Sequence, residues 1–519
     1  MDRRKFLHNS AAFISVPLLI NGQALQVFGA GSGFNPDFTE GKILILIQLD
    51  GGNDGLNMLI PVDKYDILAN LRPEVILPQN KIIGITEKQG LHPAMADMKT
   101  LFDEEKIMFI QNVGYPKPNL SHFRSKEIIH SASDSKTVVS SGWLGRYLES
   151  LHPGFPGEYP NAQNPHPLAI SIGSTTLPTC QGEAKNMSMV LQNLQTNYNS
   201  GNNETEFPDT PYGHELAYVA GIMESTEKYL TVIDETAAVT ELKSGLWPES
   251  GANGLADKLK IVARLVAGGL TTPVYMLNMG GYDTHSGQVT EGQTDTGEHA
   301  NLLKKLSVAI NAFTDELKIQ QKEDLVLGMV FSEFGRRIRS NSSFGTDHGE
   351  AFPLILFGSN VNPVVFGESP DIKPETDKDD NVKMKTDFRS VYASVLFHWL
   401  KLSQEEIRTI LFDDFEVLPI LKSATATNPE IRKKTGLEIT SVYPNPIDEN
   451  AVIRFYSTGG QAEVRLVNTD GRQSMVLFSQ SVEQGSHSFA FSRNNLPAGI
   501  YFVVIRDKTG QFSMPVTLQ

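Results

Sequence analysis

Cysteine is almost absent from this sequence: Cys180 is the single one in 519 residues. An intrachain disulfide is therefore excluded, and so is a zinc site built from cysteine thiolates. The fold must be held together by hydrophobic cores instead. A chain of this length exceeds what one core organises, so we expect at least two domains.

Positive charge is also scarce. The chain has 45 Lys and Arg against 60 Asp and Glu, a formal net charge of −15. This balance argues against nucleic acid as a partner, because such binding depends on basic side chains that neutralise phosphates. Long apolar runs are missing too. None approaches the roughly 20 residues that a membrane-spanning helix needs, so we expect no transmembrane segment.

The first 30 residues have the pattern of a targeting signal. Arg3 and Arg4 supply the positive charge, and Ala11–Ile20 is an apolar run of signal-peptide length. Gly22 and Ala24 are small residues at the spacing that a signal peptidase prefers, so we expect cleavage after Ala24. The run RRKFL resembles the twin-arginine consensus, whose pathway carries folded proteins, and implies transit through the periplasm. The alternative is an ordinary secretory signal with two arginines. In both cases residues 1–30 do not belong to the fold.

The sequence changes character towards its C-terminus. Residues 422–436 are polar and unpatterned, as in a linker. From residue 437 short alternating strands follow one another, with Asp470-Gly471 and Thr509-Gly510 as hairpin-type turns. About six or seven strands of this kind predict a small all-β sandwich.

Three motifs in this segment carry a resemblance: YPNP at 443–446, DGR at 470–472 and LPAGIYF at 496–502. Together they resemble the type IX secretion C-terminal sorting domain, over residues 437–519. The resemblance implies the type IX export machinery as a partner, and a location at the cell surface or outside the cell. The alternative is a generic adhesive β-sandwich.

Between these ends, residues 40–421 alternate between buried-strand and helix patterns. Continuous apolar runs of strand length occupy 42–49, 106–113, 167–173, 273–279, 324–331 and 352–358. Helical periodicity occupies 255–270, 297–317 and 387–402. Strands alternating with helices predict an α/β fold with a doubly wound, mostly parallel sheet. In such sheets a ligand lies beyond the carboxyl ends of the strands.

Carboxylates and histidines gather at those predicted strand ends. The residues are Asp50, Asp283, His285, Glu333, Asp347 and His348. Carboxylate oxygens with imidazole nitrogens suit zinc, manganese or iron, so we predict a metal site there. Each residue also has a plainer explanation. Asp50 could end a turn, either histidine could be structural, and Glu333 could pair with Arg336 or Arg337.

The middle segment also carries a family resemblance, on LDGGNDGLNMLIPVD, NLSHFRS, GGYDTHSGQ, VFSEFGRRIRSNSSFGTDHGEAFP and TDFRSVYASVLFHWL. These stretches lie within residues 42–402 and resemble the exported bacterial domain-of-unknown-function family fifteen-oh-one. That family is similar, more distantly, to the alkaline phosphatase and sulfatase superfamily. The resemblance implies an alkaline phosphatase-like sheet, a strand-ending Asp on metal, a Ser or Thr nucleophile, and later Asp and His residues that complete a two-metal site.

Carried over by position, the resemblance makes Asp50 the first metal ligand and Ser121 the nucleophile. His122 would assist proton transfer or pack beside it. Asp283 and His285 match the first later ligand pair. As an alternative to catalysis, Ser121 precedes a helix and could serve only as its N-cap.

The last ligands align in two ways. Asp347-His348 matches an Asp-His-Gly metal motif by letters, whereas by context Glu333 occupies that motif's place and His348 becomes the last ligand. We prefer the second alignment. It leaves Phe334 where the superfamily has a histidine, so one metal subsite lacks a ligand.

The sequence thus predicts a secreted, metal-dependent hydrolase that acts on a phosphate or sulfate ester of a small molecule or glycan. The cofactor would be a divalent ion: zinc, manganese or calcium. The alternative from another class is a non-catalytic cell-surface binding protein on the same scaffold.

Overall fold

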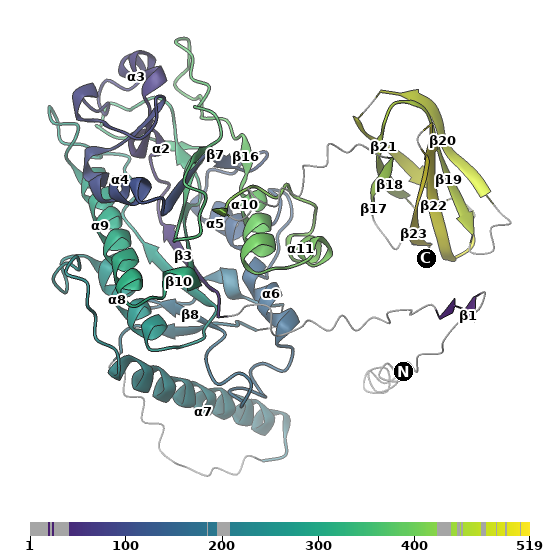
Figure 1. Cartoon of the computed structure of the whole chain (residues 1–519), viewed down its shortest axis with the longest axis horizontal. Helices are drawn as coiled ribbons and strands as arrows, with labels where there is room; N and C mark the ends of the chain where they lie inside the picture. The colour runs from purple at the N-terminus through teal and green to yellow at the C-terminus, as the bar shows by residue number, and fades with distance from the viewer. Residues whose placement is uncertain are drawn as a thin grey trace. The chain divides into compact units, whose positions relative to one another are not determined.

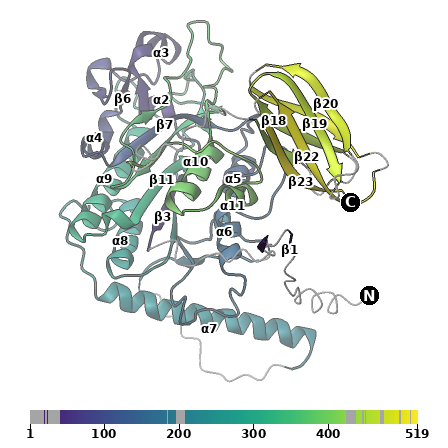
Figure 2. The ribbon, with the colours of Figure 1, turned by 45° about the vertical axis from the view of Figure 1, so that its right-hand side comes forward.

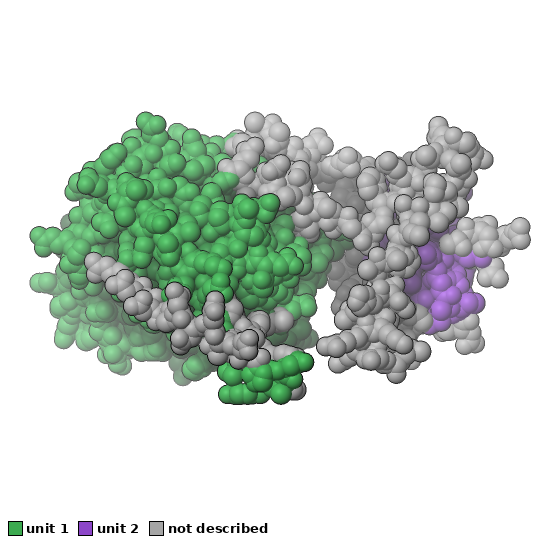
Figure 3. Space-filling view, turned by 90° about the horizontal axis from the view of Figure 1, so that it is seen from below, with its two compact units in different colours: residues 1–423 green, residues 424–519 purple. Residues whose placement is uncertain are grey.

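The computed structural model describes residues 19–20, 23–24, 41–183, 185–194, 208–422, 437–443, 447, 450–468, 474–483, 485–493, 496–508 and 510–518. The chain divides into two compact units, residues 1–423 and 424–519 (Figure 3). Arg3 and Arg4 lie outside the described residues, so the twin-arginine assignment stays a prediction. Within residues 1–30, two short strands, β1 (Leu19–Ile20) and β2 (Gln23–Ala24), pair antiparallel.

The first unit is organised by a nine-stranded sheet of described residues. Parallel strands form one side of it, in the order β11 (Val326–Ser332), β3 (Ile43–Leu49), β10 (Val274–Met279), β8 (Ala169–Ile172) and β9 (Met189–Leu191). Beyond β11 come antiparallel β14 (Phe352–Phe357), then β7 (Ile107–Gly114), with the short strands β15 (Val365–Phe366) and β16 (Thr386–Asp387) parallel to it. Every residue of β3 is buried, as its continuous apolar run predicts.

Helices cover both faces of this sheet (Figures 1 and 2). One face carries α4 (Ala96–Asp103), α8 (Gly254–Ala267) and α9 (Glu298–Ile319), which share a core with β3 and β10. Across the sheet lie α5 (His122–Ser131), α6 (Trp143–Leu151), α10 (Phe388–Ser394) with its π-helical continuation Val395–Trp399, and α11 (Gln404–Leu411). The predicted doubly wound, mostly parallel sheet is therefore confirmed. The 28-residue helix α7 (Pro211–Ala238) was not predicted.

Residues 55–91 and 335–349 form smaller elements outside the main sheet. They are α2 (Gly55–Met58), α3 (Tyr65–Leu71), the sheet of β4 (Leu59–Pro61), β6 (Gln89–Leu91) and β5 (Ile83–Gly84), and the pair β12 (Gly335–Arg336) and β13 (His348–Gly349). None of the described helices combines the length and apolarity needed to span a bilayer.

Strand direction brings five loops to one edge of the sheet. The parallel strands β3, β10 and β11 end there. Strand β7 ends there too, because β7 and β11 both run antiparallel to β14, which lies between them. The antiparallel strand β14 instead begins at this edge, which places residues 346–351 beside the other strand ends. The edge is thus where the predicted ligands collect.

The second unit contains two antiparallel sheets in its described residues. One consists of β17 (Glu438–Tyr443), β18 (Asn450–Ser457) and β21 (Gly485–Ser492); the other has the order β20 (Ser474–Val482), β19 (Gly460–Asn468), β22 (Gly499–Asp507) and β23 (Gly510–Leu518). Their apolar residues form one buried cluster, which confirms the all-β prediction. Pro444–Pro446 and the predicted turn Asp470-Gly471 lie outside the described residues.

Candidate metal centre

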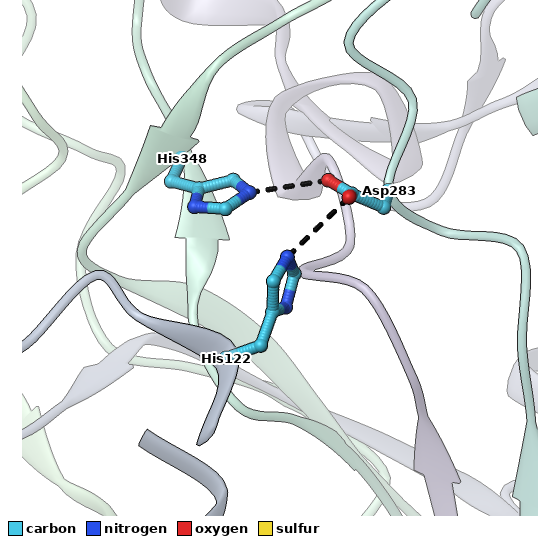
Figure 4. Close-up of side chains that lie close together, drawn as sticks. All are labelled: His122, Asp283 and His348. Carbon is cyan, nitrogen blue, oxygen red and sulfur yellow. Dashed lines mark hydrogen bonds and ion pairs between the residues drawn. The ribbon is translucent and has the colours of Figure 1, made fainter. Parts of the chain in front are cut away.

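Three side chains converge at the sheet edge: His122, Asp283 and His348 (Figure 4). Their ligand atoms lie within 4.8 Å of one another. His122 is the first residue of α5, Asp283 follows β10, and His348 lies in β13. Nε2 of His348 is 3.1 Å from Oδ1 of Asp283, and Nε2 of His122 is 3.4 Å from Oδ2.

Both imidazoles are fixed from behind through Nδ1. Nδ1 of His348 donates to the carbonyl oxygen of Leu120 at 2.8 Å, and Nδ1 of His122 lies 2.8 Å from Oε1 of the buried Glu333. A carbonyl oxygen only accepts hydrogen bonds, so Nδ1 of His348 carries the proton and Nε2 of the neutral ring presents a lone pair. Nε2 of His122 is buried and, among the described residues, has no hydrogen-bond partner. Metal-binding histidines are held in this way by a second contact behind the ring.

His285 adds a third imidazole beside the other two. Nδ1 of His285 lies 2.9 Å from Oδ1 of Asp347, while Nε2 is 3.1 Å from Oδ1 of Asp283 and 2.9 Å from Nε2 of His348. Burial alone would raise the pKa of Asp347, but hydrogen bonds from His285 and Asn341 lower it overall. The ionised carboxylate of Asp347 accepts a hydrogen bond from Nδ1 of His285, which leaves Nε2 directed at Asp283 and His348.

Asp283 supplies the negative charge at the middle of this group. Burial raises its pKa, but the guanidinium of Arg336 and the neighbouring imidazoles of His348 and His285 outweigh burial and bring the pKa down to about 2. Burial also lowers the pKa of His348, against the opposing effects of the Leu120 carbonyl and of Asp283. Near neutral pH the group therefore combines an anionic carboxylate with a neutral imidazole, the protonation states that bind a metal ion.

Arg336 holds the surrounding backbone in place. Its side chain is fully buried and donates to the carbonyl oxygens of Gly51, Gly52, Tyr282 and Thr346, and to Oδ1 of Asp283 at 2.7 Å. One guanidinium thus joins the ends of β3 and β10 to the loop before β14. The suggested pairing of Glu333 with Arg336 or Arg337 is wrong, because Glu333 accepts from the Gly51 N–H at 3.0 Å and contacts His122.

Two predicted site residues lie at the same edge with other partners. Oδ1 of Asp50 pairs with Nζ of Lys126 at 2.7 Å, and Oδ2 accepts from Nδ2 of Asn278 at 2.9 Å. Ser121 is the N-cap residue of α5 and is exposed; its N–H donates to Oδ1 of Asn119. Within the described residues its hydroxyl makes no capping hydrogen bond. The nucleophile role and the ligand role of Asp50 both stay predictions.

Phe334 forms an apolar wall against the group. Its ring centroid lies 4.9 Å from that of His122 and 4.6 Å from that of His348. The side chain is buried. Its ring carries no donor atom, so this side of the centre can orient ligands but cannot bind metal.

Sequence reasoning missed a buried polar network behind the centre. Asp54 and Arg72 form a fully buried ion pair at 2.7 Å. Oδ2 of Asp54 also accepts from Gln288 at 2.6 Å, and Oε1 of Gln288 accepts from the hydroxyls of Thr284 and Thr346. Burial raises the pKa of Asp54, but the neighbouring positive charge of Arg72 helps lower it overall. The run DGGNDG showed a second acidic residue, yet nothing in its spacing identified a partner 18 positions later.

The profile of one family covers more than half of the chain. It is described as a protein of unknown function, DUF1501, and matches residues 106–407. The chain belongs to this family. A second profile, the secretion system C-terminal sorting domain, matches residues 441–517. That domain indicates export, with a location at the cell surface or outside the cell, and implies the type IX machinery. Among curated proteins, none matches this chain.

Solved structures resemble the chain at low identity. A protein of the alkaline phosphatase superfamily from Vibrio parahaemolyticus is 10% identical, with a TM-score of 0.33, over 86% of this chain and 87% of its own. The phosphonate monoester hydrolase of Silicibacter pomeroyi is 8% identical, with a TM-score of 0.29, over 91% and 88%. A putative sulfatase from Bacteroides thetaiotaomicron is 8% identical, with a TM-score of 0.29, over 91% and 85%. At these TM-scores the likeness carries no argument about this chain's chemistry.

Proposed function

We propose that this chain is a metal-dependent hydrolase of phosphate or sulfate esters. A divalent ion would be held by His122, Asp283 and His348, with His285 beside them. The observation that carries the proposal is the set of Nε2 atoms that face one carboxylate while each Nδ1 is engaged from behind. Imidazole donors favour zinc or manganese over calcium, which prefers oxygen ligands.

Ser121 supports the choice of reaction. It is exposed at the N-terminus of α5, between Leu120, whose carbonyl holds His348, and His122. The partial positive charge of a helix N-terminus favours an anionic ester there. In the proposed reaction, Oγ of Ser121 bonds to phosphorus or sulfur as the bond to the alcohol oxygen breaks. The hydroxyl proton passes to solvent, and the alcohol takes a proton from solvent. Water then cleaves the Oγ ester and restores the serine.

A bound metal ion would supply Lewis-acid stabilisation of the ester oxygens. The protein's own contribution is orientation: Glu333 and Leu120 fix the two imidazoles, and Arg336 keeps Asp283 ionised. The sequence predicts proton transfer or packing for His122. Its Nε2 faces Asp283, so in this proposal it binds the ion and solvent takes the proton.

The test joins metal analysis to activity on the full chain. The protein is stripped with chelator, reloaded with Zn²⁺ or Mn²⁺, and assayed on a panel of phosphate and sulfate monoesters. We expect wild type to retain metal and hydrolyse at least one ester. Asp283→Asn should lose the metal, and Asp379→Asn, a surface carboxylate paired with Arg337, should retain it.

Ser121→Ala distinguishes the covalent reaction from the helix-cap alternative. It should retain metal and melting temperature and lose hydrolysis, because the hydroxyl makes no capping bond. A loss of about 0.5–2 kcal/mol in stability, with activity falling only as the folded fraction does, would assign the residue to capping. Wild type that binds metal but cleaves no ester would favour the non-catalytic binding protein, and wild type without metal would refute the centre.

A further inference from the structure

Asp50 is the predicted metal ligand whose carboxylate is already satisfied by the protein. Lys126 approaches Oδ1 at 2.7 Å and Asn278 donates to Oδ2 at 2.9 Å. Asn278 is itself fixed, because its Oδ1 accepts from Nζ of Lys258 at 2.9 Å. Both oxygens of Asp50 are thus engaged.

The Asp50–Lys126 pair lies directly beside the three-residue group. Lys126 follows His122 by one turn of α5, so the two side chains project from the same helix face. Asp50, at the end of β3, is followed by Gly51. The N–H of Gly51 donates to Oε1 of Glu333, and the same oxygen contacts Nδ1 of His122. Two parallel bridges therefore join the end of β3 to α5: one through Glu333 to His122, and one from Asp50 to Lys126.

Lys126 occupies the carboxylate that a second divalent ion would need. Four carboxylates lie at this edge: Asp50, Asp283, Glu333 and Asp347. Glu333 and Asp347 contact His122 and His285. Asp50 alone pairs with a lysine, so a second divalent ion bound to Asp50 would have to displace Lys126.

We propose that the ammonium group of Lys126 serves as a built-in second cation, so that the centre holds one divalent ion where the superfamily pattern implies two. The inference rests on the proposed function. Lys126 is 35% exposed, so the N–H groups not directed at Asp50 remain open to an anionic oxygen. An ester oxygen bound between the ion and Lys126 would meet positive charge on both sides.

Metal stoichiometry tests this directly on the full chain. Chelator-treated wild type, Lys126→Met and Lys126→Arg are titrated with Zn²⁺ by calorimetry, with metal content checked by mass spectrometry. Lys228→Met, which removes a lysine paired with Glu224 on α7, is the matched control. We expect one ion per chain in wild type, Lys126→Arg and the control. Lys126→Met should bind a second, weaker ion, and adding Asp50→Asn to it should remove that ion.

Binding of inorganic phosphate is the second readout, measured at one equivalent of Zn²⁺. Loss of a charged hydrogen bond should weaken phosphate binding roughly 10- to 100-fold in Lys126→Met, and Lys126→Arg should restore most of it. Melting temperatures show that each variant is folded. Two ions in wild type, or one ion in both wild type and folded Lys126→Met, would overturn the inference. Wild type that binds no ion would refute the metal centre itself, a separate failure.

Discussion

Replacing Arg336 by Met should destabilise the α/β unit strongly, because that one side chain joins three strand-end loops. Methionine keeps the aliphatic length but removes every donor. The carbonyl oxygens of Gly51, Gly52, Tyr282 and Thr346 would then lose a charged partner in a buried position. Asp283 would lose the hydrogen bond that does most to lower its pKa.

The size of the loss follows from those contacts. A hydrogen bond to a charged group contributes about 1.5–3 kcal/mol, but contributions that share one side chain are not additive. Leaving a buried carbonyl oxygen without a partner costs about 1–3 kcal/mol, and because such losses are not additive we expect about 3–5 kcal/mol in total for Arg336→Met. Arg336→Lys keeps one charge and three donors, so its loss should be smaller. A loss of this size is a large part of the total stability of a domain.

Tryptophan fluorescence during urea unfolding measures the effect on the right unit. All three tryptophans, Trp143, Trp247 and Trp399, belong to residues 1–423, so the signal does not report on the sorting domain. Arg337→Met is the matched control, since Arg337 pairs with Asp379 near the surface and should contribute under about 1 kcal/mol. Equal losses in the two variants, or a loss below about 1 kcal/mol in Arg336→Met, would refute the role given to Arg336.

Two further predictions concern acid stability and secretion. Burial lowers the pKa of His130 and of His299 to about 4, below the 6.5 of the unfolded chain, so the unfolded state takes up protons first on acidification. The contribution of each histidine to the free energy of unfolding should be fully present above pH 6.5 and should fall by roughly 3 kcal/mol towards pH 4. In His299→Gln the fall should be shallower. Urea unfolding at a series of pH values measures this, and a free energy of unfolding that does not change with pH would contradict it. Deleting residues 437–519 should leave a folded protein in the periplasm, because that segment has its own core. Fractionation that finds the truncated chain at the cell surface would count against the sorting function.

The apolar runs located the six longest strands of the sheet but not all their directions, and they missed the short strands β9, β15 and β16. The runs predicted at 42–49 and 273–279 became β3 and β10 with ends shifted by a residue. The run at 352–358 became β14, which is antiparallel to β11. A continuous apolar run does not indicate strand direction, because a strand buried on both faces has the same pattern in either direction. Helix α7 was missed because its apolar residues do not follow one face; Tyr212 and Met223 are exposed.

The motifs located the edge at which Asp283, His285 and His348 meet. Asp283 and His285 follow β10, and His348 precedes the antiparallel strand β14, which begins at the same edge. The motifs did not distinguish residues that face the centre from those that support it. Glu333 was predicted as a ligand, yet it contacts Nδ1 of His122 from behind. That distinction depends on which nitrogen of a ring points inwards, and a one-dimensional pattern contains no such information. The partners of Asp54 were hidden for the same reason.

The contacts of Phe334 and Lys126 act in the same direction on the proposed centre. The ring of Phe334 offers no donor atom on one side of the group, and Lys126 engages the carboxylate of Asp50 on another. Either contact alone would leave a second metal ion with an incomplete set of ligands. Together they remove a donor and supply a fixed positive charge. The single-ion centre that we propose, with Asp283 and three imidazoles around the ion and the ammonium group of Lys126 beside it, is consistent with both contacts.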